Sequence, residues 1–147
     1  MADLTVTITD EVKIEGKNKG NTSIQLITGI NDVYNRIITI PVTETNVYST
    51  DRTLVSGSTL DEDLIKYARI TNKDATNFVT LRISNDDNDE VLYKLGAGET
   101  FVLYNHASSL DAIDNAVQAI ASEGSIKDIT AIANTLPCKL DVLVASA

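Results

Sequence analysis

The chain has 147 residues, 43% of them hydrophobic, and a formal net charge of −9 at pH 7. This length suits one domain, residues 1–147, and the apolar content is ample for a core, which argues against a disordered chain. The acidity, with 12 basic residues scattered and no basic run, argues against nucleic acid and against an anionic membrane surface as partners.

Cysteine usage and the N-terminus indicate the compartment. Cys138 is the only cysteine, so no internal disulfide can form, which suits a reducing cytoplasm. Met1 and Ala2 lead into a strand pattern without signal-peptide features, and no run approaches the roughly 18 apolar residues of a membrane span. We therefore expect a soluble protein that is not exported by the ordinary route.

A strand pattern begins almost at the N-terminus. Leu4, Val6 and Ile8 alternate with threonines, as a half-buried strand requires, and the pattern extends towards Ile14 before a turn at 16–20. The first strand is therefore predicted within the first ten or so residues.

Three further strands are predicted next, at 23–28, 33–42 and, more weakly, 45–54. A turn at 29–32 separates the first two, and Pro41, which lacks the N–H that a ladder needs, stops the second. A polar and acidic loop then runs through 56–63.

Residues 67–105 contain four short strand-like runs joined by turn signals. The runs are YARITN, FVTLRIS, VLYKL and TFVLYN, and the joining segments are KDATN, NDDNDE and GAGE. We predict a complete antiparallel meander, in which each strand pairs with the next along the chain.

The C-terminal third contains the one segment with helical spacing. Leu110, Ile113, Val117 and Ile120 recur at intervals of three and four, which predicts a helix over 110–122, although a long loop with apolar anchors would show the same pattern. Two closing strands are predicted at 126–133 and 139–145. The fold class is therefore mainly all-β: an antiparallel β-sandwich or a jelly-roll-like barrel, with at most one short helix near 110–122.

Few residues offer catalytic chemistry. His106 is the only histidine, which excludes a multi-histidine metal site and leaves one candidate general base. We interpret it as a surface-loop residue. Cys138 has only Lys139 as an electropositive neighbour, so we interpret it as a small buried residue at a strand start.

Two loops resemble ligand sites. Asp86, Asn88 and Glu90 occupy the first, third and fifth positions of a hypothetical calcium loop, but Val91 and Ala97 stand where glycine and a bidentate glutamate are needed. A solvated hairpin tip accounts for the same residues, and ion binding remains the alternative. The acidic run 61–63 is interpreted as a charged loop.

The glycine-rich segment 96–99 lacks the third glycine and the following helix of a dinucleotide-binding loop. We interpret it as a tight turn. No catalytic, cofactor or metal site is predicted, and the chain is not expected to be an enzyme.

The phrases Arg69-Ile70-Thr71-Asn72 and Leu95-x-Ala97-Gly98-Glu99, followed by an apolar strand, resemble small structural proteins of tailed bacteriophages, particularly marine and cyanobacterial phages. About 40 residues carry the likeness. It implies a virion component assembled in the host cytoplasm, most simply a capsid decoration (cement) protein that binds the major capsid protein or other virion proteins and stabilises the particle. Such proteins commonly form homotrimers. The alternative is a sandwich domain of a tail or head fibre with a role in binding host carbohydrate.

If that resemblance holds, an N-terminal arm or an edge strand is the expected docking element, because an unpaired strand edge adds readily to a neighbour's sheet. The residues predicted to make this protein–protein contact are Ala2, Asp3, Leu4, Thr5, Val6, Thr7, Ile8 and Thr9.

Overall fold

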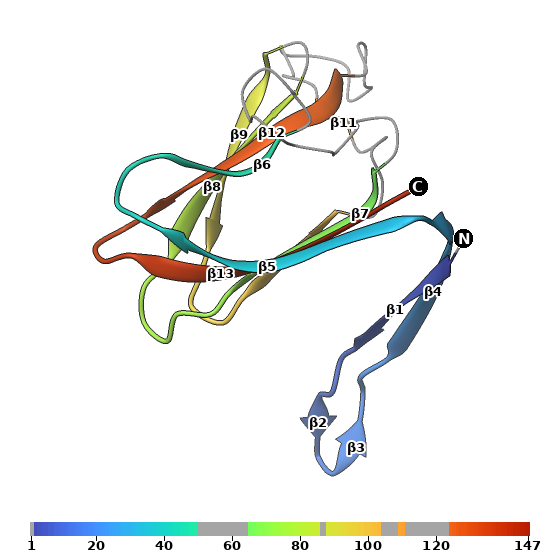
Figure 1. The fold of residues 1–147 in the computed structure, drawn as a ribbon. Helices are drawn as coiled ribbons and strands as arrows, with labels where there is room; N and C mark the ends of the chain where they lie inside the picture. The colour runs from blue at the N-terminus through green and yellow to red at the C-terminus, as the bar shows by residue number, and fades with distance from the viewer. Residues whose placement is uncertain (1, 50–64, 86–87, 104–108, 111–123) are drawn as a thin grey trace, which may run out of the picture.

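Two antiparallel β-sheets pack face to face in the computed structural model, which describes residues 2–49, 65–85, 88–103, 109–110 and 124–147 (Figure 1). The first sheet has the order β10-β7-β13-β5, built from Thr100–Leu103, Ile65–Asn72, Cys138–Ser146 and Asp32–Ile40. In the second sheet β12 pairs with both β8 and β6, and β8 also pairs with β9. These strands are Gly124–Ala133, Val79–Asn85, Thr45–Ser49 and Glu90–Leu95, and the short β11, Ser109–Leu110, lies beside the start of β12.

The strands follow one another as a ribbon folded over on itself. The chain runs out through β5, β6, β7 and β8 and returns through β9, β10, β12 and β13, so that β5 pairs with β13, β6 with β12, β7 with β10 and β8 with β9. Wrapping the ribbon brings β13 beside β7 and β12 beside β8. This is the connectivity of a jelly roll, with two separate sheets in place of a closed barrel.

The predicted all-β sandwich is confirmed, and the barrel alternative is not. The helix predicted over 110–122 lies outside the described residues apart from Leu110, which belongs to β11. No helix occurs in the described part of the chain. The turn predicted at 29–32 is a short bend: β4 runs on through Ile30, β5 begins at Asp32, and Gly29 has a φ of 79°.

The predicted meander over 67–105 is wrong. β8 and β9 do form a hairpin, but β7 lies in the first sheet and pairs with β10, so the chain crosses between the sheets after β7 and again after β9. A period of two indicates which face of a strand is buried. It does not indicate which strand lies alongside, and the prediction failed on that point.

The inward-facing side chains of both sheets form one core. Its largest fully buried members are aliphatic: Ile40, Ile70, Leu81, Leu95, Ile129 and Leu140. Alternation along β8 is complete, with Val79, Leu81 and Ile83 buried and the residues between them half-buried. Burial of each such side chain contributes about 1.5–3 kcal/mol, which makes this core the main source of stability.

Hydrogen bonds link the crossings at one end of the sandwich. Asn72, fully buried at the end of β7, donates its side-chain amide to the carbonyls of Asn77, Leu95 and Gly96 at 2.9, 3.3 and 3.0 Å. Its side-chain oxygen accepts from the Asp74 N–H at 3.0 Å. One residue therefore fixes both the β7–β8 and the β9–β10 crossings.

Backbone bonds extend this linkage to the remaining crossings at the same end. The Lys73 N–H donates to the Lys139 carbonyl at 2.8 Å, and the Asn134 N–H donates to Phe78 at 3.2 Å. The Ala133 N–H donates to the Pro41 carbonyl at 3.0 Å. The β12–β13 and β5–β6 crossings are thereby tied to the others.

We expect Asn72→Ala to lower the free energy of unfolding by about 2–4 kcal/mol, because the buried carbonyls and the Asp74 amide lose their partner. Urea unfolding followed by circular dichroism measures the change. Asn35→Ala, on the exposed face of β5, is the matched control and is expected to change stability by less than about 0.5 kcal/mol. Equal stability of the two variants would contradict this role for Asn72.

Candidate functional site

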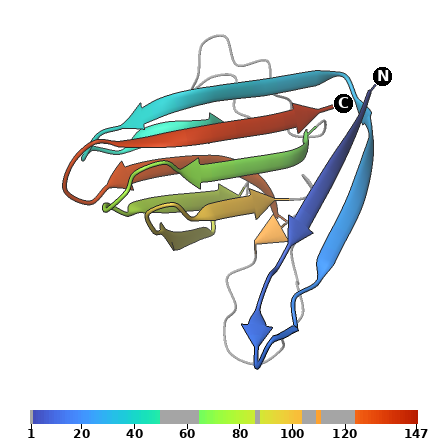
Figure 2. The same ribbon diagram turned by 90° about the horizontal axis from the view of Figure 1, so that it is seen from below.

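A two-stranded arm projects from the sandwich. β1, Ala2–Thr9, pairs with β4, Thr22–Ile30, and the short strands Lys13–Ile14 (β2) and Lys17–Asn18 (β3) form the tip of the arm. The arm leaves the sandwich where both chain termini lie, and its tip stands clear of both sheets (Figures 1 and 2). The predicted contact residues 2–9 are the whole of β1.

The base of the arm packs on the outer face of the first sheet. Val6 and Ile30 are buried against Tyr67 and Ala145, and half-buried apolar side chains surround them: Leu4, Ile27, Val102 and Leu143. The Asn31 N–H donates to the Ser146 carbonyl at 2.9 Å and fixes the junction between β4 and β5. The arm is therefore anchored by a small second core.

Beyond this base the apolar side chains of the arm are exposed. Ile8, two residues past the buried Val6, is 41% exposed. On the opposite face Ile24 and Leu26 are 69% and 60% exposed, and they lie directly across the ladder from Thr7 and Thr5. At the tip, Val12 and Ile14 are also exposed. The arm presents apolar surface that its own sandwich does not cover.

The arm also lacks the usual protection of an edge strand. Residues 4–9 and 22–30 contain no ionisable side chain and no proline, in a chain that is 22% charged. In the described part of the chain, β1 pairs with no strand but β4, and β4 with none but β1. Charges and prolines on edge strands normally prevent unwanted pairing, so an edge without them is open to another strand.

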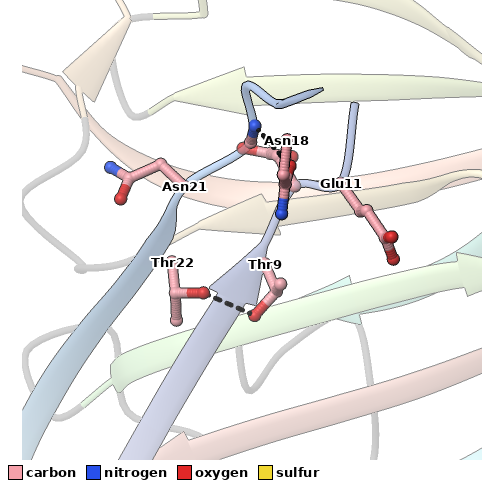
Figure 3. Close-up of a pocket in the computed structure, with 7 residues that line it drawn as sticks. Thr9, Glu11, Asn18, Asn21 and Thr22 are labelled. Carbon is pink, nitrogen blue, oxygen red and sulfur yellow. Dashed lines mark hydrogen bonds between the residues drawn. The ribbon is translucent and has the colours of Figure 1, made fainter. Parts of the chain in front are cut away.

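A hollow of about 350 Å³ lies at the waist of the arm, where the β1–β4 ladder gives way to the tip (Figure 3). Its lining is polar and consists of Thr9, Asp10, Glu11, Asn18, Gly20, Asn21 and Thr22. The Thr9 and Thr22 hydroxyls face each other at 3.3 Å, while Glu11 turns away and pairs with Lys13 at 2.7 Å. The Thr9 and Thr22 hydroxyl oxygens and the Glu11 carboxylate therefore do not point toward a common centre that could hold an ion. In the described residues, no cluster of three or more His, Cys, Asp or Glu side chains could hold a metal ion.

Gly20 determines the shape of the waist. A Cβ on this residue would lie 1.7 Å from the Asp10 carbonyl oxygen, so only glycine allows the two segments to approach this closely. The Asp10 N–H donates to the Asn21 carbonyl at 2.8 Å, and the Lys19 N–H donates to Val12 at 2.7 Å. These bonds hold the tip in line with the arm.

The other residues considered for chemistry lie elsewhere. Cys138 is fully buried, and burial, with a smaller contribution from the negative charge of Asp74, raises the pKa of its thiol. The Cys138 thiol donates to the Leu136 carbonyl at 3.4 Å. The interpretation of Cys138 as a buried residue at a strand start is confirmed. His106 lies outside the described residues, as does the acidic run 61–63.

The acidic β8–β9 turn is described in part. Asn88 has a φ of 66°, and the Asp89 N–H donates to the Asn85 side-chain oxygen at 2.7 Å. Glu90 pairs with Arg82 at 3.0 Å. These contacts are those of a hairpin tip, while Asp86, the first position of the hypothetical calcium loop, lies outside the described residues.

The glycine-rich turn between β9 and β10 is a tight turn, as predicted. Gly98 has a φ of 74°, and the Gly96 N–H donates to the Glu99 carboxylate at 2.7 Å. The Gly98 N–H donates to the Asn72 carbonyl at 3.0 Å. The two sequence phrases that suggested a phage protein therefore meet in space and share a structural role.

Comparisons of the chain with protein-family models, with curated proteins and with solved structures gave no match. The described part of the chain contains no helix with the length and hydropathy of a membrane span. The sequence predicted one of the two strands of the arm. The prediction named β1 but not the exposed Ile24 and Leu26 of β4, which the lack of charge over 22–30 could have indicated.

We expect Gly20→Ala to open the waist of the arm, because a backbone clash of this kind costs about 1–3 kcal/mol. The amides of Asp10 and Lys19 should then exchange hydrogen about tenfold faster or more. The Ala133 amide, at the far end of the sandwich, is the internal control and should keep its protection. Unchanged exchange at Asp10 and Lys19 would contradict the proposed role of Gly20.

The Asp74 carboxylate should make the stability of the protein depend on pH. Its carboxylate accepts from the backbone N–H groups of Asn77 and Thr76 at 2.7 and 2.8 Å, and these bonds lower its pKa in the folded protein. A lowered pKa contributes stability that is present above the ordinary pKa of aspartate, about 4, and is lost as the pH falls through the folded value. We expect Asp74→Asn to destabilise the protein at pH 7, and the difference from the wild type to shrink as the pH falls below the ordinary pKa of aspartate. A difference that stays constant from pH 7 to pH 2 would argue against the carboxylate charge as the cause.

Proposed function

We propose that this chain is a virion structural protein, most specifically a capsid decoration protein, that acts through protein–protein contacts made by the β1–β4 arm. The major capsid protein is the proposed partner. The protein assembles in the host cytoplasm and becomes part of the particle.

The observation that carries this proposal is the exposed apolar surface of the arm. Ile24 and Leu26 stand side by side with a row of threonines, and residues 4–9 and 22–30 contain no charged side chain. Exposed apolar groups of this kind on a projecting element are typical of interaction surfaces, since contact with a partner removes them from water. The arm is held by a buried anchor at one end, so it presents this surface in a fixed direction.

The fold is compatible with the proposal and does not select it. Jelly rolls occur in viral capsid proteins, lectins and cupins alike, and function depends on the site that a fold carries. The sequence phrases that resemble phage proteins add a separate line of support. In this chain the two phrases meet where the Asn72 N–H donates to the Glu99 carbonyl at 2.9 Å.

Co-sedimentation tests the proposal, with capsids assembled from the major capsid protein encoded by the same genome. We expect the wild-type chain to pellet with them and Ile24→Ser/Leu26→Ser to bind at least about tenfold more weakly, because two central apolar side chains are lost from the contact. Ile37→Ser/Leu92→Ser is the matched control. It removes two equally exposed apolar side chains from the sandwich, which are 63% and 71% exposed, and should pellet like the wild type.

Failure of the wild-type chain to pellet would overturn the capsid proposal. Binding of that same chain on a glycan array would then favour the alternative, a fibre-associated sandwich domain. Equal binding by the arm variant and the wild type would leave a capsid protein whose contact surface is not the arm.

A further inference from the structure

We propose that two copies of this chain join through the free edge of β1, in an antiparallel register about a twofold axis at Val6. The product is a four-stranded sheet with the order β4-β1-β1-β4. This inference rests on the arm being the contact surface of the proposed function, and it names the partner of one edge as a second copy of the chain.

The phase of the β1–β4 ladder shows which backbone groups are available at that edge. The Asp10 N–H donates to the Asn21 carbonyl at 2.8 Å, and the register continues from there as Thr9 opposite Thr22 and Ile8 opposite Ser23. Hydrogen-bonded and non-hydrogen-bonded pairs alternate in an antiparallel ladder. Ile8, Val6 and Leu4 therefore bond to β4, and the backbone groups of the threonines between them point to the other edge.

The sequence of β1 is suited to pairing with itself. Residues 4–8 read Leu-Thr-Val-Thr-Ile, which has the same pattern in both directions about Val6. In the proposed register Leu4 lies opposite Ile8 of the second copy, Thr5 lies opposite Thr7, and Val6 lies opposite its equivalent. Each face of the two paired β1 strands then keeps one kind of side chain over residues 4–8.

Neighbouring registers lose this match. A one-residue slip of one strand against the other places apolar residues on the threonine face. Moving the twofold axis to Thr7 preserves the faces but places Leu4 opposite Asp10 and Asp3 opposite Glu11, where two carboxylates would repel each other. Only the axis at Val6 pairs like side chains throughout 4–8.

Charge explains why the contact falls on the arm. Two copies carry a net charge of −9 each and repel one another at long range, so close approach is favoured where ionisable groups are missing. The longer edge strands of the sandwich carry such groups: β5 contains Asp32 and Arg36, and β9 contains Glu90 and Lys94. The edge strands β10 and β6 carry no charge but are only four and five residues long. β1 has none from Leu4 to Thr9.

Pairing also provides what the arm lacks as a structure. A two-stranded hairpin is marginally stable in water, and three or more strands with an apolar face are needed for independent stability. The pair would make the apolar face of the arm, which carries Val6, continuous with the same face of the second copy, which carries Ile8. On the outer face it would bring the threonines of the two β1 strands together, with Ile24 and Leu26 of each copy on either side.

The mass of the purified protein and a set of charge variants test the inference, without capsids present. Sedimentation equilibrium should give twice the chain mass of 15.9 kDa for the wild type. Thr5→Lys/Thr7→Lys places like charges opposite each other in both halves of the pair and should raise the dissociation constant about tenfold or more. Both threonines are exposed, so folding is expected to be retained.

Two further variants isolate the register. Thr22→Lys/Thr28→Lys adds the same charge to β4, away from the shared edge, and should dissociate close to the wild type. Thr5→Lys/Thr7→Glu places opposite charges across the axis and should restore pairing. If the opposite-charge variant dissociates as readily as Thr5→Lys/Thr7→Lys, the register is wrong, and a monomeric or trimeric wild type overturns the twofold pair itself.

The outcome is separable from that of the proposed function. A wild-type dimer that does not pellet with capsids supports the pairing and refutes the decoration role. A monomer that pellets with capsids refutes the pairing and supports the decoration role. The trimer implied by the likeness to phage proteins is distinguished from the pair by the measured mass.

Discussion

The buried amide of Asn72 is the interaction on which the connectivity of the sandwich depends. The two sheets share no ladder in the described residues, so each passage of the chain from one sheet to the other needs hydrogen bonds of its own. Asn72 supplies them at two passages, since it binds the end of β9 and the loop that leads into β8 while its backbone pairs with the β9–β10 turn. Because a buried carbonyl without a partner costs about 1–3 kcal/mol, a leucine of similar volume could not replace it.

The sequence predicts well which face of each strand is buried, and predicts poorly which strands lie next to each other. Alternation located β8, β12 and β13 nearly to the residue, since a half-buried strand admits no other pattern. The same alternation does not indicate which strands pair with each other. The meander prediction failed because β7 and β8 follow each other along the chain but lie in different sheets. The signal that could have corrected it is Asn72 itself: a polar residue at the end of an apolar strand, with no charge that would place it in water.

The alternation of residues 4–8 predicts a strand but not its projection from the sandwich, and only the resemblance to phage proteins suggested an arm. Residues 4–8 have the pattern of a half-buried strand, and one face of β1 is indeed buried near its start, at Val6. The pattern does not predict that burial ends two residues later, at Ile8. That limit depends on where the outer face of the first sheet ends. Tyr67 illustrates the converse. It points outward from β7, yet it is only 6% exposed because the base of the arm covers it.

The two ends of the molecule therefore follow opposite rules. At the Asn72 end, side-chain and backbone hydrogen bonds join the crossings. At the arm, the backbone edge of β1 is unpaired in the described residues, and the charges that protect β5 and β9 are missing from it. Thr5 and Thr7 are exposed, so the fold of the single chain would accept a lysine at either position. The absence of any charged side chain over residues 4–9 is the physical reason for the proposed pairing through this edge.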